Sequence, residues 1–237
     1  MAYSDHCVPC IVGKHPQHPY SNHRHRASAV CELLHMDSCG PFPVLTPHKK
    51  SSFWAILDDK SNYGHVKLLS ARSDVFDTYW KVESLWEVKS GNHVIFIHMD
   101  GAKEFCHGCL EEHLTLCSIT MQVTAPYAHS QNEKIKQYIH TLEDGSQTLV
   151  DSGLAMTYWG DAVLTTNYLH NCVPTSTLPD NVMPYEELEH IKPNLSHLCV
   201  WGCQCFVTIP LVLESLVQSG FLAQKNKTET ETGPAIS

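Results

Sequence analysis

"FWAILDDKSNYGHVKLL", residues 53–69, holds two short apolar runs on either side of a polar turn. The runs at 53–59 and 63–69 carry aromatic and branched side chains, and the Asp, Lys, Ser and Asn between them favour a reversal of the chain. Upstream, "VCELLHMD" at 30–37 is a similar run, and a proline-rich connection joins it to the others. Three strands this closely spaced predict an antiparallel meander.

Beyond the meander, helical and extended patterns alternate. Apolar residues between Val75 and Trp86 recur at intervals of three and four, which predicts a helix over 73–89. The continuous apolar run "HVIFIHM" at 93–99 is typical of a strand buried on both faces. The remaining predicted elements are a helix at 104–117, a strand at 119–123, a helix starting with "QNEKIKQYIHTL" and a helix at about 157–171. This order predicts an α/β fold, a mixed five-stranded sheet with helices on both faces.

The composition predicts a globular protein with a sizeable core. The chain has 237 residues, of which 43% are hydrophobic and 17% charged. A net charge of −9 argues against strong affinity for duplex nucleic acid. The 11 cysteines, without a signal peptide or a long apolar run, predict reduced thiols in the nucleus or cytoplasm, no secretion and no membrane association.

Two aspartates at strand ends are candidate site residues. Asp37 ends the first predicted strand, and Asp100 follows the apolar run at 93–99. In open α/β sheets, groups at strand ends line the functional crevice, but either aspartate could instead cap a turn or a helix. Asp58 and Asp59 also end a strand, and we interpret them as turn residues.

Successive segments resemble the blocks of copia-type long-terminal-repeat retrotransposon integrases, in order and in spacing. The segments are "HMDSCGPFP", "FWAILDDKSNYGHVKLL", "IHMDGAKEF", "TAPYAHSQNEKIKQ", "YWGDAVLTTNYLHNCVPT", "MPYEEL" and "KPNLSHLCVWGC". The N-terminal "CVPCIVGK" is similar to the closing C-x-x-C-x-x-G-K of the integrase zinc module. The resemblance covers about residues 7–210 and identifies the chain as a truncated, diverged piece of a Gag-Pol polyprotein.

The resemblance implies an RNase H-like catalytic core with two-metal chemistry. In that family three carboxylates hold two Mg²⁺ or Mn²⁺ ions during attack on a phosphodiester. By motif, Asp37 and Asp100 match the first two carboxylates. The interval that names the D,D-35-E integrases then leads from Asp100 to Lys136, where the third is expected. The family also implies DNA as partner, with RNA a further option, and a homo-oligomer.

Lys136 changes the expected chemistry. A lysine has no acceptor and is positive, so it removes one attraction for the metals and adds one repulsion. The change should cost several kcal/mol of metal affinity even at an effective dielectric of about 20. Asp37 and Asp100 could retain one weakly held ion, or the ammonium could replace a metal and pair with both. We therefore expect an integrase core that is catalytically inactive.

Two other functions stay open. An active transferase could use Glu133, or less readily Glu143, as its third ligand. Alternatively, the host could retain the chain as a non-catalytic module that binds nucleic acid or protein. In either case Asn132, Lys134 and Gln137, around the start of the catalytic helix, are the predicted nucleic-acid contacts.

Cys7 and Cys10 have the spacing of half a structural zinc site. The resemblance implies that two upstream histidines would complete it, and a His-rich arm with two free thiols is the alternative. We expect a zinc-module remnant at 1–28 and a catalytic core at 29–195. The start of a truncated SH3-like β segment is expected at 196–212, and an irregular tail at 213–237.

Overall fold

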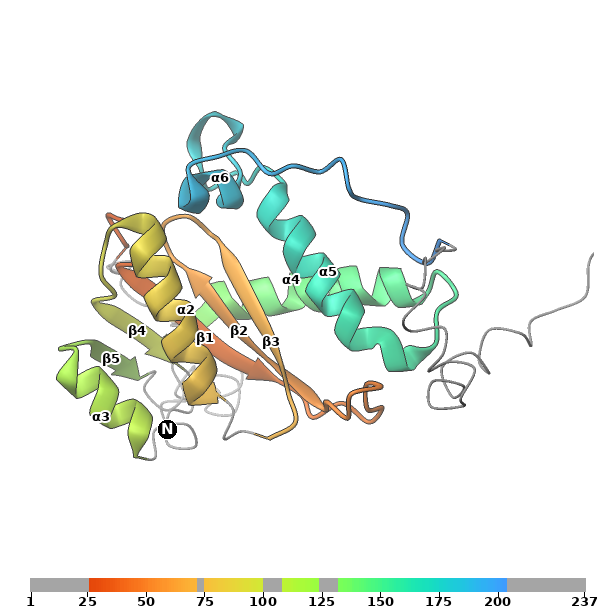
Figure 1. The fold of residues 1–237 in the computed structure, drawn as a ribbon, viewed down its shortest axis with the longest axis horizontal. Helices are drawn as coiled ribbons and strands as arrows, with labels where there is room; N and C mark the ends of the chain where they lie inside the picture. The colour runs from red at the N-terminus through yellow and green to blue at the C-terminus, as the bar shows by residue number, and fades with distance from the viewer. Residues whose placement is uncertain (1–25, 72–74, 100–107, 124–131, 204–237) are drawn as a thin grey trace, which may run out of the picture. The chain divides into compact units, whose positions relative to one another are not determined.

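The structure is a computed structural model, and it describes residues 26–71, 75–99, 108–123 and 132–203 (Figure 1). The strands are β1 (Leu33–Cys39), β2 (Ser52–Asp58), β3 (Gly64–Leu69), β4 (Phe96–Met99) and β5 (Thr120–Val123). The α-helices are α2 (Val75–Ser90), α3 (Cys109–Leu116), α4 (Glu133–Val150), α5 (Trp159–Cys172) and α6 (Pro184–Glu189). Two short 3₁₀ helices are η4 (Met156–Tyr158) and η5 (Pro179–Asn181).

The five strands form one mixed sheet in the order β3-β2-β1-β4-β5. β1 pairs antiparallel with β2, with Met36 opposite Ile56, and parallel with β4, with Met36 opposite Met99. β2 and β3 are antiparallel, whereas β4 and β5 are parallel. The predicted meander and the predicted mixed five-stranded sheet are therefore confirmed.

Helices cover both faces of the sheet because side chains alternate along each strand. Leu34 and Met36 of β1 face a core that they share with α2 and α3. His35 points to the opposite face, where α4 packs on β1 and β2 and α5 packs on β3 (Figure 1). The buried residues of α4 lie at the predicted helical spacing, and they are Ile135, Tyr138, Ile139 and Leu142.

The prediction that the run at 93–99 is buried on both faces is wrong. The strand is shorter, Phe96–Met99, and its burial alternates. Ile97 and Met99 are buried in the α2–α3 core, whereas Ile95, just before the strand, is 47% exposed. An apolar run does not indicate which face of a strand other elements cover. Here only the face toward α2 and α3 is fully buried.

The chain divides into two compact units, Met1–Leu198 and Cys199–Ser237. The described part of the second unit, residues 199–203, contains a turn in which Cys203 N donates to Val200 O at 3.1 Å. The rest of the predicted SH3-like segment lies outside the described residues, as do Cys7, Cys10 and the zinc-module remnant. Within the described ranges, no helix is long and apolar enough to cross a membrane.

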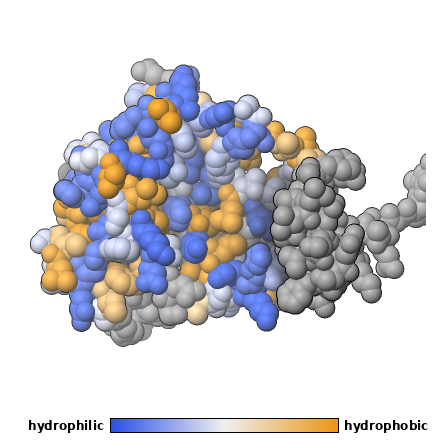
Figure 2. All heavy atoms as spheres, viewed as in Figure 1, coloured by the Kyte–Doolittle hydropathy of each residue, from blue (hydrophilic) through white to orange (hydrophobic). Residues whose placement is uncertain are grey.

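Hydrophobic and hydrophilic side chains are interspersed on the face that α2 presents in Figure 2. The exposed apolar side chains of α2 are Trp80, Leu85 and Val88. The sequence-predicted site residues that the structure describes are Asp37 on β1 and Asn132, Lys134, Lys136 and Gln137 at the start of α4, so the candidate site is sought on the α4 side of the sheet.

Candidate active site

Asp37 lies in the C-terminal half of β1, on the same face as His35 and Cys39. Its carboxylate is half-buried, and Oδ1 accepts a hydrogen bond from the backbone N–H of Ser38 at 2.8 Å. Asp100 is outside the described residues, so the relative positions of the two predicted metal ligands are not described.

Helix α4 is tied to the sheet along both of its flanks. On one flank, Lys134 Nζ donates to Asp59 Oδ1 at 3.0 Å. On the other, Cys39 Sγ donates to Glu143 Oε1 at 3.0 Å. Burial, followed by the bond to Glu143, raises the pKa of the Cys39 thiol to about 12, which keeps this donor protonated at neutral pH.

Lys136 belongs to the same flank of α4 as Glu143. The two residues are about two helical turns apart, so their side chains project in nearly the same direction. Since Glu143 reaches Cys39, and Cys39 shares one face of β1 with Asp37, this flank faces the half of β1 that carries Asp37. The partly buried Lys136 thus lies on the side of α4 that faces this half of β1.

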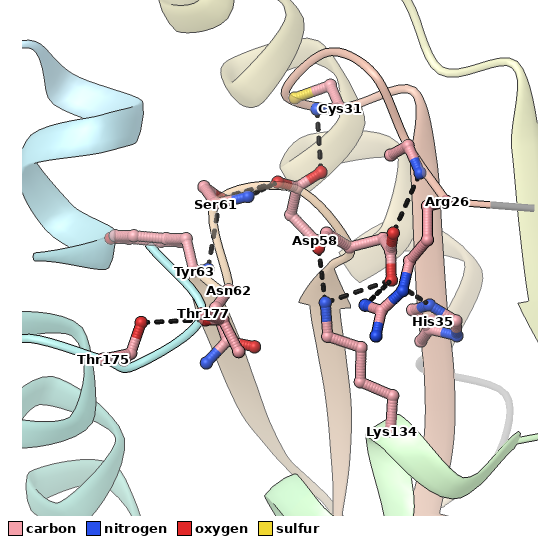
Figure 3. Close-up of polar contacts among 12 residues, drawn as sticks. Arg26, Cys31, His35, Asp58, Ser61, Asn62, Tyr63, Lys134, Thr175 and Thr177 are labelled. Carbon is pink, nitrogen blue, oxygen red and sulfur yellow. Dashed lines mark hydrogen bonds and ion pairs between the residues drawn. The ribbon is translucent and has the colours of Figure 1, made fainter. Parts of the chain in front are cut away.

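Asp59 contacts three side chains near the start of α4, those of Arg26, His35 and Lys134, which are labelled in Figure 3. Its Oδ1 contacts His35 Nε2 at 3.1 Å and Arg26 at 3.5 Å in addition to Lys134, and its Oδ2 accepts from Ala27 N at 2.9 Å. Burial alone would raise the pKa of Asp59. The hydrogen bond with His35 and the Lys134 ammonium outweigh burial and hold that pKa well below its usual range.

Asp58 closes the turn after β2. One carboxylate oxygen accepts from Cys31 N at 2.8 Å, and the other accepts from both the N–H and the hydroxyl of Ser61 at 2.6 Å (Figure 3). Burial raises the pKa of this carboxyl group despite these bonds. Asp58 therefore acts within the turn, as we interpreted it, but the role of Asp59 as an anchor for α4 was missed.

The three predicted nucleic-acid contacts do not form one accessible surface. Asn132 has no exposed surface. The side chain of Lys134 is only 17% exposed and is paired with Asp59. Gln137 is exposed, with Nε2 at 3.5 Å from Glu133 Oε1. Because buried or ion-paired side chains are poor partners for a phosphate backbone, only Gln137 is positioned for such contact.

Comparison with known proteins extends this picture. No protein-family model matches the chain. The chain is 25% identical over 209 residues to the "Retrovirus-related Pol polyprotein from transposon TNT 1-94" of Nicotiana tabacum. The match covers 86% of this chain but only 15% of the polyprotein, so the chain spans a small part of that relative's length.

Solved structures share the fold. The HTLV-2 integrase catalytic core domain in complex with magnesium, in its dimeric form, matches with a TM-score of 0.50 and 10% identity over 70% of this chain and 100% of that one. A chain of the simian T-cell lymphotropic virus intasome, in complex with PP2A regulatory subunit B56 gamma, matches with a TM-score of 0.57 and 13% identity. This match covers 82% of the present chain and 66% of that one. The chain is therefore similar to part of a retrotransposon Pol polyprotein, and it shares its fold with retroviral integrase catalytic cores.

The described residues of this integrase-type core do not fit a two-magnesium centre. Mg²⁺ takes oxygen ligands in near-octahedral geometry, whereas Lys136 offers only donors. Glu143, on the same flank, already accepts the Cys39 thiol. Among the family-matched positions that the structure describes, Asp37 alone contributes a carboxylate.

Glu133 precedes Lys136 by three residues, so its side chain projects in a neighbouring direction, about 60° around the axis of α4. It lines a cavity of about 370 Å³ together with Lys134, Gln137, Tyr138, Asn62 and His170. Lys134 and Gln137 belong to the flank that faces Asp59 and α5, not the flank of Lys136. Through this cavity Glu133 shares its surroundings with Lys134 and Gln137.

Proposed function

We propose that this chain is an integrase-type core that keeps the DNA partnership of its relatives but does not carry out two-metal phosphoryl transfer. The observation that carries the proposal is the position of Lys136, on the α4 flank whose Glu143 is bonded to the end of β1. The motif spacing that matches Lys136 to the third carboxylate supports it independently.

The electrostatic penalty is large enough to abolish metal binding. An ammonium about 4 Å from a divalent ion is repelled by several kcal/mol at an effective dielectric of about 20, and the carboxylate's attraction is lost as well. Because about 1.4 kcal/mol is tenfold in affinity, Mg²⁺ affinity should fall by at least roughly a thousandfold. Asp37 and Asp100 therefore remain as the two carboxylates of the motif, with an ammonium in place of the third.

A strand-transfer assay on model DNA ends with Mn²⁺ tests the proposal. Three proteins are compared: the natural chain, Lys136→Glu, and Lys192→Glu, which makes the same charge change at an exposed position. Activity in Lys136→Glu alone would support the proposal. Activity in the natural chain would overturn it.

Metal binding gives a second readout that does not require turnover. We expect Mn²⁺ to raise the thermal unfolding midpoint of Lys136→Glu by mass action, and to leave the natural chain and Lys192→Glu unchanged. Tight Mn²⁺ binding by the natural chain that is lost in Asp100→Ala would contradict the proposal. If the natural chain were active, loss of activity in Glu133→Gln would identify the alternative ligand.

DNA binding is the part of the ancestral function that we propose is retained, together with self-association. One of the similar structures is of an intasome, and another is of an integrase core in a dimeric form. In a chain of net charge −9, binding needs a local cationic surface, and Lys50, Lys67 and Lys81 line an open groove between β3 and α2. DNA binding should weaken steeply with salt, and Lys67→Glu should reduce DNA binding more than Lys192→Glu does.

Sedimentation of the purified protein tests self-association.

A further inference from the structure

A cluster of three different donor side chains lies between α2 and α3, on the sheet face opposite α4. His113 Nε2 is 2.6 Å from Glu83 Oε2, and Cys117 Sγ is 3.8 Å from the same nitrogen. The three donor atoms all lie within 4.8 Å of one another. Glu83 belongs to α2, whereas His113 and Cys117 are one helical turn apart at the end of α3.

Packing holds the imidazole of His113 in position. Phe76 and Tyr79 of α2 lie edge-on to it, with ring centroids at 5.9 and 6.0 Å. The side chain of Glu83 is only 6% exposed, whereas Cys117 reaches the surface. The cluster therefore has one buried donor, one partly buried donor and one exposed donor at the solvent side.

The surroundings favour a cation over a free thiolate. The thiol of Cys117 lies beside the buried carboxylate of Glu83, with the donor atoms within 4.8 Å of each other. Cys117 is also the C-cap of α3, and the C-terminal end of a helix dipole attracts cations and repels anions.

We propose that Glu83, His113 and Cys117 bind one Zn²⁺ ion, or a divalent ion of similar softness, and so tie α2 to α3. A carboxylate, an imidazole and a thiolate are zinc ligands, and a thiolate is a poor ligand for Mg²⁺. Three protein ligands leave a fourth position, which opens to solvent beside Cys117. The site is separate from the Asp37 region, and it does not depend on the proposed loss of transferase activity.

The distances identify the movements that binding requires. With Zn–S near 2.3 Å and Zn–N or Zn–O near 2.1 Å, tetrahedral geometry needs about 3.6 Å between sulfur and nitrogen and about 3.4 Å between nitrogen and oxygen. The His113–Glu83 hydrogen bond must therefore open from 2.6 Å. Sγ is almost equidistant from both ring nitrogens, at 3.9 and 3.8 Å, so Cys117 must rotate toward the lone pair of Nε2.

A nucleophilic Cys–His–Glu triad is the competing interpretation of these residues. A nucleophilic cysteine needs a lowered pKa, commonly from a helix N-terminus or a neighbouring cation. Here Cys117 lies beside the carboxylate of Glu83, and it sits at a helix C-terminus. Both features oppose a thiolate nucleophile, whereas a bound divalent ion would deprotonate the thiol and be favoured by the helix end.

Cobalt binding to the full chain tests the proposal. The experiment uses Cys7→Ser/Cys10→Ser as the parent protein, so that the N-terminal cysteines cannot contribute. We expect one Co²⁺ per chain with a thiolate-to-cobalt charge-transfer band, displaced by Zn²⁺. Adding Cys117→Ser should abolish the band, and Glu83→Gln should weaken affinity by at least about tenfold.

Cys109→Ser is the matched control, because Cys109 is an exposed cysteine in the same helix. It should leave the band and the affinity unchanged. Far-ultraviolet circular dichroism establishes that each variant is folded, and exposed Cys117 is not part of the core. The proposal is overturned if the parent binds no Co²⁺ at micromolar concentration, or if the folded Cys117→Ser variant keeps the charge-transfer band.

Discussion

Lys134 Nζ lies 3.0 Å from Asp59 Oδ1, and this ion pair joins the first turn of α4 to the end of β2. The side chains are only 17% and 4% exposed, so the pair is largely withdrawn from water. Burial lowers the pKa of Lys134, and Asp59 partly offsets this effect. The pair therefore holds the helix that carries Lys136, and each partner keeps the other's charge compensated.

Asp59→Asn should destabilise the protein by about 2–4 kcal/mol, because it leaves the Lys134 ammonium buried without its carboxylate. Lys134→Met should cost less, since Asp59 keeps His35 and Arg26. Urea unfolding of both single variants and the double variant measures their coupling, which we expect to exceed about 1 kcal/mol. Asp144→Asn, at a carboxylate 73% exposed, is the control. A coupling near zero would show that the pair does not anchor α4.

Gly145→Ala should destabilise the protein although alanine is favoured in a helix by about 1 kcal/mol. A Cβ at Gly145 of α4 would lie 2.4 Å from Cγ2 of the buried Thr166 on α5. Overpacking of this kind costs about 1–3 kcal/mol. Thr166→Ser removes that methyl and keeps the hydroxyl that donates to Ala162 O.

In the Thr166→Ser background, Gly145→Ala should cost less stability, as measured by thermal unfolding, because the 2.4 Å contact is removed and Oγ1 remains at 3.1 Å. The effect of Gly145→Ala would then depend on one methyl group of the neighbouring helix α5. Equal effects in both backgrounds would mean that α4 and α5 do not approach this closely.

His65 should make the protein less stable in mild acid. Burial, with a smaller contribution from Lys67, lowers the pKa of His65 from its usual 6.5 to about 4. Between these values the unfolded chain binds the proton and the folded protein does not. Stability that is present above pH 6.5 is therefore lost as pH falls toward 4, by about 1–2 kcal/mol between pH 7 and pH 5.

The measurement is urea unfolding of the natural chain and His65→Gln at several pH values. Other carboxyl groups titrate in both proteins, so the difference between the two curves isolates the histidine. We expect that difference to shrink or reverse in favour of the variant as the pH falls. Parallel curves would contradict the prediction.

Cys39 should react slowly with iodoacetamide at neutral pH. A thiol pKa of about 12 in place of 9.0 lowers the thiolate fraction by roughly a thousandfold, and the thiolate is the nucleophile. Glu143→Gln removes the carboxylate that accepts the thiol and should raise the rate, while exposed Cys109 should react alike in both proteins. Peptide-level mass spectrometry follows each cysteine, and an unchanged Cys39 rate in Glu143→Gln would contradict this account.

Local patterns predicted most of the fold. The apolar spacing of α2 and α4 and the closely spaced meander strands became the observed helices and antiparallel strands, because each pattern reports a buried face directly. The prediction that the run at 93–99 is buried on both faces was wrong, because burial of a strand face depends on which elements pack against it. Helix α6 was not predicted, because six residues give too little periodicity.

The candidate site was predictable only where motif spacing reports position. Lys136 was assigned by spacing from Asp100, and the flank of α4 that carries it can be related to β1 through Glu143 and Cys39. The pairing of Lys134 with Asp59 spans 75 positions in the chain, so no local pattern indicates it. The same holds for Glu83 and His113, which are brought together by the packing of separate helices.

The two ties of α4, one to Asp59 and one to Cys39, fix the azimuth of the helix about its own axis. Neither tie uses the side chain at position 136. The orientation of the helix is therefore specified before any metal enters, and the determinants of folding and of chemistry are separate. The side chain at position 136 can therefore change without altering the orientation of the helix, and under the proposed function Lys136→Glu would direct a carboxylate where the ammonium now points.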